Sequence, residues 1–599
     1  MKFWARLLCV AALGLTPLTL RAQYWSDYVL EKGFDSRDYF LRPHRVLTLN
    51  LKNLDQGLLG ILPDPLSEIS FQPATLATIT GSRLYIDLKG SAEKPEAPEY
   101  RVYPLYAYAN ADFAPPYFAR PTERKLEPLV SALYVGDVAA KILPGVKFAL
   151  AYELIHHQGT FYEYVPYWYY GAYDAFGQKA EAGRDFPELE PNIKQDGLDE
   201  KTETAHLLDA YLAFKPAKFL ALGAKVSRVQ TDVDGDYVRL NNYDERNYPY
   251  VSRYHNAKNV GAELRQTEVS AGALLTFAQR QVGVFAGRVS GDHLQTASDR
   301  DSSFYSYDDG VQNDYFSRSR YSHESASQWK HEGQTNFAGI HGELPMQHDI
   351  AFRFRAEYHK SDLELINGDT VQDTSASFYR FRYYADSLIY TGDYSSRFSD
   401  DRQGAGEEKL TRKSVAFGLV IPMRERSEFT VSLSVESDES KLLMYEDAQL
   451  YRSSHQRTPT PWQAPESLIG IEDKTLRLDR NTTTTRVALP VTMSYYLGRG
   501  FTLHAGAIKQ YLKISAKEII DIWYRTDSLV VIRPSGTTPE NPPQRIDRYL
   551  ATPARRSENS LDFRLGLSFE PSKHVRLDLG TSTSLTDLEA WQFAVLLHL

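Results

Sequence analysis

The sequence predicts an all-β fold, a closed antiparallel transmembrane β-barrel of about 16 strands. No segment after residue 22 approaches the roughly 18 consecutive apolar residues that a membrane-spanning helix needs. Segments with apolar side chains at every second position recur in pairs across short turns, and long polar stretches separate the pairs. The last such segment, residues 591–599, ends on the final residue. The apolar face of this strand needs lipid to cover it, and the free edge of the strand needs another strand to pair with.

The two ends of the chain indicate an exported protein. Residues 1–6 carry two basic side chains, residues 7–20 are largely apolar, and a cleavage site for a signal peptide follows near Ala22. The mature chain would contain no cysteine, because Cys9 lies in the signal peptide. Residues 591–599 resemble the terminal strand of bacterial outer-membrane β-barrel proteins. This resemblance implies the outer membrane of a Gram-negative cell as the location.

Seven hairpins are expected in the body of the chain, with short periplasmic turns at residues 143–145, 215–218, 278–281, 345–349, 422–428, 498–500 and 570–574. A first strand at residues 84–88 and a terminal strand at residues 591–599 bring the number of strands to 16. Segments 45–52 and 101–107 leave 14 and 18 strands as alternatives. Long extracellular loops are expected at residues 90–128, 156–205, 229–266, 290–334, 360–412, 436–485 and 513–558.

The strand face opposite the apolar side chains is expected to line the barrel lumen. A charge on the lipid face near the bilayer midplane costs roughly 2–4 kcal/mol, so charged residues of spanning strands should point inward. Seven basic and seven acidic residues fit this description: Lys147, Glu153, Asp209, Lys225, Glu268, Glu343, Arg353, Arg355, Glu357, Arg486, Asp562, Arg564, Arg576 and Asp578. Two interpretations stay open, a salt-bridged interior that supports the wall and an aqueous path whose charges set selectivity.

Residues 23–81 are expected to form a small periplasmic or plug segment ahead of a barrel at residues 82–599. Within it, residues 64–77 predict a short helix, a turn and another short helix. This stretch resembles the segment before strand one in barrels of the long-chain fatty-acid transporter (FadL) type, which has an Asn-Pro-Ala-x-Leu-Ala-like motif; here Gln72 replaces the Asn. That family has fourteen strands, fewer than expected here. The resemblance implies a plug in the lumen, with Asp64, Phe71 and Pro73 as candidate residues, while a segment that caps the barrel floor stays open as the alternative.

Composition and motifs argue against several classes of function. Cleavage removes three basic and no acidic residues, which takes the net charge from −9 to about −12 and disfavours nucleic acid as a partner. The chain contains no Gly-x-Ser-x-Gly, no His-Glu-x-x-His and no phosphate-binding loop. We therefore expect no enzyme, no catalytic residue, no cofactor and no metal site.

The expected function is that of an outer-membrane porin or passive transporter. Small solutes, apolar ones included, would cross a polar lumen that the N-terminal segment plugs or gates. The alternative is a surface or assembly barrel that does not transport and whose Tyr-rich extracellular loops bind a partner; residues 161–173 are the densest aromatic cluster. Expected partners are outer-membrane lipid, lipopolysaccharide and the barrel assembly machinery, and the sequence does not specify the solute.

Overall fold

The computed structural model describes residues 41–46, 60–62, 64–89, 130–137, 145–159, 196–245, 250–277, 280–308, 315–382, 389–424, 426–457, 465–540, 546–550, 554–582 and 591–599. The expected signal peptide, the alternative strand at residues 101–107, the expected loop at 90–128 and most of the one at 156–205 lie outside these residues. Among the described residues, no helix has the length and apolar character to span a membrane.

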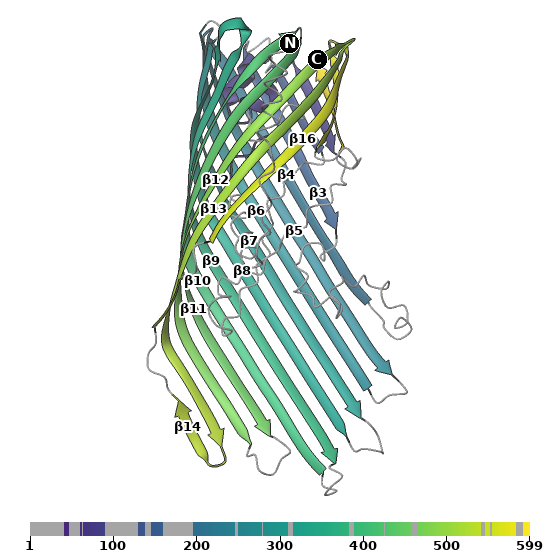
Figure 1. The fold of residues 1–599 in the computed structure, drawn as a ribbon, viewed down its shortest axis with the longest axis vertical. Helices are drawn as coiled ribbons and strands as arrows, with labels where there is room; N and C mark the ends of the chain where they lie inside the picture. Colours follow the sequence, from purple (N-terminus) through teal and green to yellow (C-terminus); the bar gives the residue numbers. More distant parts are fainter. Residues whose placement is uncertain are drawn as a thin grey trace.

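Antiparallel strands make up most of the described structure (Figure 1). In chain order they are β1 (Arg83–Lys89), β2 (Val130–Asp137), β3 (Val146–Gly159), β4 (Asp196–Ala217), β5 (Leu220–Glu245), β6 (Tyr250–Phe277), β7 (Arg280–Asp308), β8 (Phe316–Pro345), β9 (Ala351–Arg382), β10 (Ile389–Arg424), β11 (Ser427–Arg457), β12 (Glu466–Gly498), β13 (Phe501–Arg533), β14 (Gly536–Glu540), β15 (Ile546–Leu550), β16 (Ala554–Ser572), β17 (Val575–Ser582) and β18 (Trp591–His598). The helical pieces are α3 (Pro65–Glu68), η2 (Pro73–Thr78) and η6 (Gln347–Asp349).

The strands close into a ring. Each of β1 to β13 pairs with the next, β13 pairs with β16, and β17 and β18 complete the circuit back to β1. The short strands β14 and β15 pair only with β13, so the ring has 16 strands, as predicted. At the seam, β1 and β18 run from Arg83 opposite His598 to Lys89 opposite Gln592, which confirms the predicted partner of the terminal strand. Arg45 and Val46, within the alternative segment 45–52, belong to no strand.

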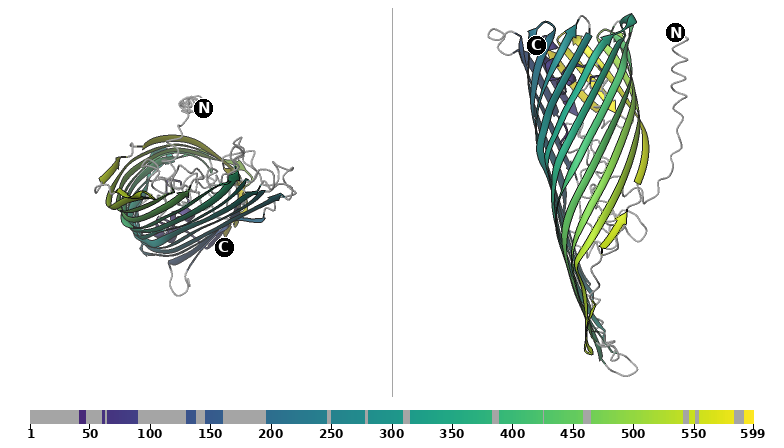
Figure 2. Two further views of the ribbon diagram at one scale, coloured as in Figure 1. Left: turned by 90° about the horizontal axis from the view of Figure 1, so that it is seen from below. Right: turned by 90° about the vertical axis from the view of Figure 1, so that its left-hand side faces the viewer.

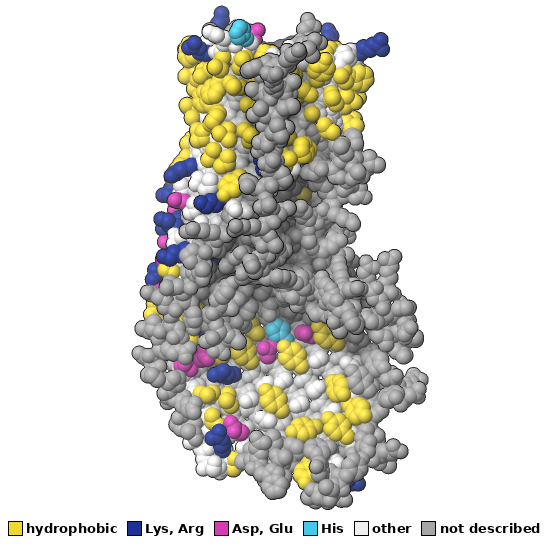
Figure 3. Space-filling model, viewed as in Figure 1, with side chains coloured by type: hydrophobic (Ala, Val, Ile, Leu, Met, Phe, Trp, Pro, Cys, Tyr) yellow, Lys and Arg dark blue, Asp and Glu magenta, His cyan; other side chains and the backbone are white. Residues whose placement is uncertain are grey.

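Apolar side chains form a belt on the outer surface at the end that carries the short turns, and Figure 3 shows one face of it. Val226, Val415, Leu489, Leu565 and Phe593 belong to this belt on five different strands, and they are 38% to 52% exposed. Exposed apolar side chains in such number suit contact with lipid rather than water. The chain therefore folds as an outer-membrane type of β-barrel.

The strands continue far beyond the belt. β10 is 36 residues long, whereas a tilted strand needs about 9–11 residues to cross a bilayer. Long loops are therefore wrong for five stretches that β5 to β16 largely occupy: residues 229–266, 290–334, 360–412, 436–485 and 513–558. Outside the membrane both strand faces meet water, so the polar and apolar alternation that marks a strand in the sequence fades. Figures 1 and 2 show this extended wall tapering away from the belt.

Candidate functional site

Residues 64–80 fold into the two short helices that the sequence predicts. Asp64 caps α3, because its carboxylate accepts hydrogen bonds from the backbone N–H of Leu66 (3.2 Å) and the hydroxyl of Ser67 (2.6 Å). Pro65 and Pro73 stand at the first positions of α3 and η2, where a missing N–H costs nothing. Gly81 then adopts a positive φ of 71° and turns the chain into β1.

This segment and the nearby residues 60–62 contact the inner wall almost all the way round. Its apolar side chains share one buried cluster with β1 to β6 and with β18. Phe71 packs against β7 and β8, and Glu68 pairs with β9. Ile61 lies against β10, and Leu62 shares a buried cluster with β12 and β13. We refer to residues 41–46, 60–62 and 64–80 together as the plug.

Three glycines make room for the plug on neighbouring strands of the wall. Gly223, Gly272 and Gly283 lie on β5, β6 and β7. A Cβ atom at Gly223 would overlap the backbone of Pro73, and one at Gly272 would overlap the side chain of Gln72. The absence of side chains here lets the plug backbone approach the wall directly.

Gln72 ties the plug to the wall inside this glycine patch. Its side-chain nitrogen donates hydrogen bonds to the carbonyl oxygens of Ala273 on β6 and Val284 on β7, both at 3.1 Å. Gln72 is completely buried, so loss of these bonds would leave a buried amide unpaired.

Phe71 occupies an aromatic site next to the patch. Its ring meets the rings of Phe285 and His341 edge-on, at centroid distances of 5.5 and 5.2 Å. The guanidinium of Arg355 lies 5.6 Å from the Phe71 centroid, within range of a cation–π interaction. Phe71 is completely buried, and the aromatic contacts hold the turn between α3 and η2 against β7 to β9.

Farther from the short turns than Phe71, the inner wall mixes apolar side chains with buried charged ones, such as Arg402. Phe71 belongs to one buried cluster with Trp329, Leu365, Met444 and Leu478, among others, on β8, β9, β11 and β12. On β9, Leu365 has the same parity as Arg355, which contacts the plug, so both point into the lumen. The apolar side chains on β8, β9, β11 and β12 thus form a patch of this wall beyond the plug, which we call the apolar strip.

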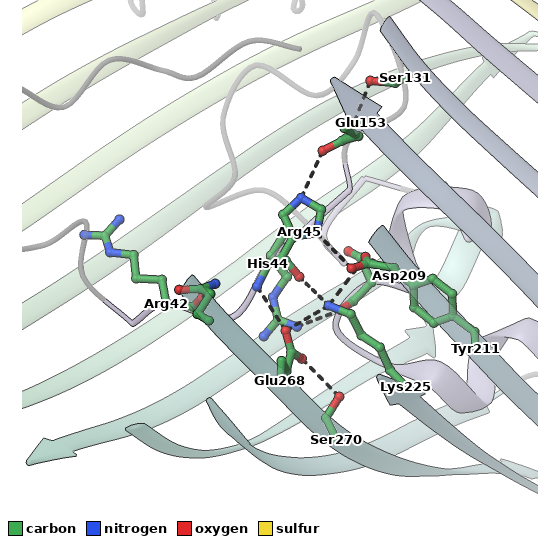
Figure 4. A network of polar contacts seen from close by, with 12 residues as sticks. Arg42, His44, Arg45, Ser131, Glu153, Asp209, Tyr211, Lys225, Glu268 and Ser270 are labelled. Atoms are coloured by element: carbon green, nitrogen blue, oxygen red, sulfur yellow. Dashed lines mark hydrogen bonds and ion pairs between the residues drawn. The ribbon is translucent and has the colours of Figure 1, made fainter. Parts of the chain in front are cut away.

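His44 lies at the centre of a buried polar network (Figure 4). Its Nδ1 is 3.0 Å from Asp209 Oδ1 on β4, and its Nε2 is 2.9 Å from Glu153 Oε2 on β3. Its backbone N–H donates to Glu268 Oε2 on β6 at 3.0 Å. Lys225 on β5 donates to the carbonyl oxygen of His44 at 2.5 Å and to Glu268 at 2.9 Å. One residue of the plug thus engages four consecutive strands.

The charges around His44 favour its protonated form. Burial alone lowers the pKa of the imidazole, but the carboxylates of Asp209 and Glu153 outweigh burial and raise the pKa of His44 to about 10. Both ring nitrogens then donate hydrogen bonds. Protonated His44 and Lys225 together oppose the three carboxylates of Glu153, Asp209 and Glu268.

A second ionic cluster joins the plug to β8 and β9. Arg353 donates to Glu68 of α3 at 2.8 Å and also pairs with Glu343. Burial raises the pKa of the Glu68 carboxyl, and the Arg353 guanidinium opposes that rise. Arg45 donates to the carbonyl oxygen of Ser70 at 2.7 Å, which links the stretch that carries His44 to the end of α3.

The structure brings eight of the fourteen lumen candidates to the plug. Four surround His44 (Glu153, Asp209, Lys225 and Glu268), and four lie in or beside the second cluster (Glu343, Arg353, Arg355 and Glu357). Four others form separate ion pairs: Lys147 with Asp137 at 3.1 Å, Arg486 with Glu436 at 3.5 Å, and Arg576 with Asp578 at 2.9 Å. Asp562 and Arg564 lie on β16, and their side chains are not among those described.

Sequence reasoning missed three plug residues: His44, Arg45 and Gln72. His44 and Arg45 stand in a short polar stretch without periodicity, and their partners on the strands, Glu153 and Glu357, lie more than 100 residues away. Gln72 stands where the FadL-type motif has Asn, and the substitution keeps a side-chain amide that could have marked it as a hydrogen-bonding position.

Comparison with known proteins yields only distant likenesses. No family model matches the chain, and no curated protein matches it. Among solved structures, it is similar to a FadL homologue of Pseudomonas aeruginosa (11% identity, 93% of this chain and 100% of that chain, TM-score 0.31). Others are the RagAB peptide importer in a closed-closed state (8%, 87% and 87%, 0.22) and a mutant of the ferric enterobactin receptor PfeA of Pseudomonas aeruginosa (8%, 85% and 89%, 0.18). All three TM-scores lie below 0.5, which is too low to establish a shared fold. The fold assignment therefore rests on the strand pairing and the apolar belt.

Proposed function

We propose that this chain is a passive transporter for small solutes in the outer membrane, and that the plug gates its lumen. The observation that carries the proposal is the docking of the plug. It contacts the wall around nearly the whole circumference, through the glycine patch, the Phe71 site and two ionic clusters. A plug of this extent leaves solutes no wide aqueous path until it moves.

The nature of the contacts supports a plug that moves rather than a fixed floor. Hydrogen bonds and ion pairs carry much of the attachment, and water can replace them when the plug leaves the wall. Several lumen charges would then be exposed to water, so that the open path is polar. The apolar strip beyond Phe71 supports apolar solutes as part of the substrate range, because a small apolar molecule gains by leaving water for such a surface.

Conductance of the purified protein in planar bilayers tests the gating. Gly272→Val adds an inward side chain where Gln72 docks, while valine still suits a strand. Ala271→Val is the matched control, because Ala271 is exposed and its side chain lies on the opposite, lipid-facing side of the same strand. We expect little current from the natural protein and from Ala271→Val, and stable stepwise current from Gly272→Val.

Two outcomes would overturn the proposal. A large, permanently open current from the natural protein would mean that the plug does not close the lumen. Absence of current through Gly272→Val, in a protein that still shows heat-modifiable migration on gels, would favour the alternative of a surface or assembly barrel that does not transport. For a current that does appear, liposome swelling with solutes of matched size and different polarity measures the preference for apolar solutes.

A further inference from the structure

A row of cations stands directly beyond the apolar belt on the outer surface, at the edge away from the short turns. Arg228, Arg288, Lys360, Lys413 and Lys513 come from β5, β7, β9, β10 and β13, and all five are exposed. On each strand the outward residue two positions nearer the turns is Val, Ala or Tyr. We call these five residues the cationic collar.

The strands between the cations contribute no acid to the collar. At the same level β6 presents Thr267, β8 presents Asn336, and β11 and β12 present Ser437 and Thr485. These nine strands thus carry five cations at this level, in a chain with 77 acidic and 68 basic residues, and their nearest outward carboxylates, Asp362 and Glu439, lie one outward position farther from the short turns. The pattern departs from the composition of the chain.

Strand pairing aligns four of the collar residues in two groups, and the register shifts by two residues between the groups, because Lys360 faces Thr411 and not Lys413. Arg288 faces Asn336 across β7 and β8, and Asn336 faces Lys360 across β8 and β9. Two strand spacings separate the two cations, about 10 Å. On β10 to β13, Lys413 faces Ser437 and Thr485 faces Lys513. Ser437 and Thr485 face each other between the two cations.

The contacts of the collar leave its positive charge largely uncompensated. Arg228 donates to the hydroxyl of Thr267 at 2.9 Å, and Arg288 donates to the amide oxygen of Asn336 at 2.8 Å. Among the described residues the only collar ion pair is that of Lys360 with Asp362, at the long distance of 4.0 Å.

Cations farther from the belt behave differently. Lys330 pairs with Glu332 at 2.6 Å, and Lys409 pairs with Glu407 at 2.8 Å. Acids are therefore common on the outer wall, and they begin one outward position beyond the collar. At the left edge of Figure 3, dark blue side chains begin where the yellow belt ends, and magenta ones lie among them farther out.

We propose that the cationic collar binds the phosphate groups of a phosphorylated glycolipid in the outer leaflet. The edge of the belt is the level of lipid headgroups, and the short turns mark the opposite edge as periplasmic. Cations flanked by hydroxyl and amide groups supply both the charge and the hydrogen-bond donors that phosphate oxygens accept. The inference rests on the proposed membrane placement.

Lipid binding measured by native mass spectrometry tests the proposal, with the full mature protein in neutral detergent and a metal chelator. The probes are lipid A with both phosphates, the same lipid without phosphates, and inorganic phosphate. We expect the natural protein to retain phosphorylated lipid A and to bind the other two weakly. Retention of both lipids to the same extent would refute phosphate recognition, and equal competition by inorganic phosphate would indicate an unspecific anion site.

A pair of double variants locates the site. Arg288→Gln with Lys360→Gln should lower the affinity for phosphorylated lipid A by roughly 30-fold, at about fivefold for each cation near an anionic surface. The double variant Lys330→Gln with Lys409→Gln removes two positive charges as well, but from cations that lie farther from the belt and are paired with acids. It should change the affinity for phosphorylated lipid A little. Equal losses in both would contradict a localised collar. The collar variant should retain natural conductance, so the outcome is distinguishable from a failure of the gating proposal.

Discussion

Raising the pH should weaken plug docking through His44. In the docked state His44 lies between Asp209 and Glu153, which raise its pKa to about 10 against the burial that lowers it. Glu268 and Lys225 also face it, through its backbone. In an undocked plug His44 would meet water and return to its ordinary pKa of 6.5. The docked state therefore binds a proton that the undocked state releases above that pH.

The sign and the size of the effect follow from this difference. A raised pKa stabilises docking fully below pH 6.5, and the stabilisation is lost as the pH rises toward the docked value of about 10. Between pH 6.5 and 8.0 the docking constant should fall about 15-fold, roughly 1.6 kcal/mol, because each pH unit is worth about 1.4 kcal/mol per proton and the undocked imidazole is still half protonated at pH 6.5. This figure requires that the docked pKa lie well above 8.

Open probability in planar bilayers at symmetric pH 6.0 and 8.0 measures the effect. We expect the natural protein to open more often at pH 8.0, and His44→Gln to lose most of this difference and to open more often at pH 6.0. Burial of Glu68 adds a dependence of the same sign that begins near its ordinary pKa of 4.5, and His44→Gln retains it. An unchanged pH response in His44→Gln would refute the role of this side chain.

Two further predictions concern the barrel. Leu565→Arg, in the belt on β16, should impair assembly by roughly 2–4 kcal/mol, while Asn559→Arg, on the same strand face beyond the belt, should be tolerated, as heat-modifiable migration would show. Equal assembly of both would contradict the position of the belt. Cysteines introduced at Ala594 and Asp87, which face each other across the seam, should crosslink in intact membranes, and deletion of residues 591–599 should abolish heat-modifiability. A deletion variant that still folds would show that closure does not need β18.

The membrane-spanning part of the fold could be predicted because lipid imposes a pattern on it. The alternation of Phe352, Phe354 and Tyr358 on β9 reflects one face in lipid, and the same rule located the terminal strand. Beyond the belt this constraint ends. The run of residues 482–485 on β12 is four successive threonines, which carry no alternation although they lie within a strand.

The plug site could be predicted only in part. Glu153 and Asp209 were identified as inward residues because a charge cannot face lipid, but their meeting at His44 depends on contacts 109 and 165 residues apart in the chain. A polar residue in an irregular segment carries no periodic signal of its partner. Gln72 and Gly272 likewise acquire meaning only when the plug is seen against the wall.

The position of the plug in the chain has a consequence for how the barrel is built. The partners of His44 and Gln72 all lie on β3 to β7, so the surface that receives these two residues is complete before the later strands are needed. The seam between β1 and β18 uses the last segment of the chain and is the final pairing that a growing ring can make. The early strands can therefore assemble around the plug. Pairing of β18 with β1 then closes the barrel with the plug already in the lumen.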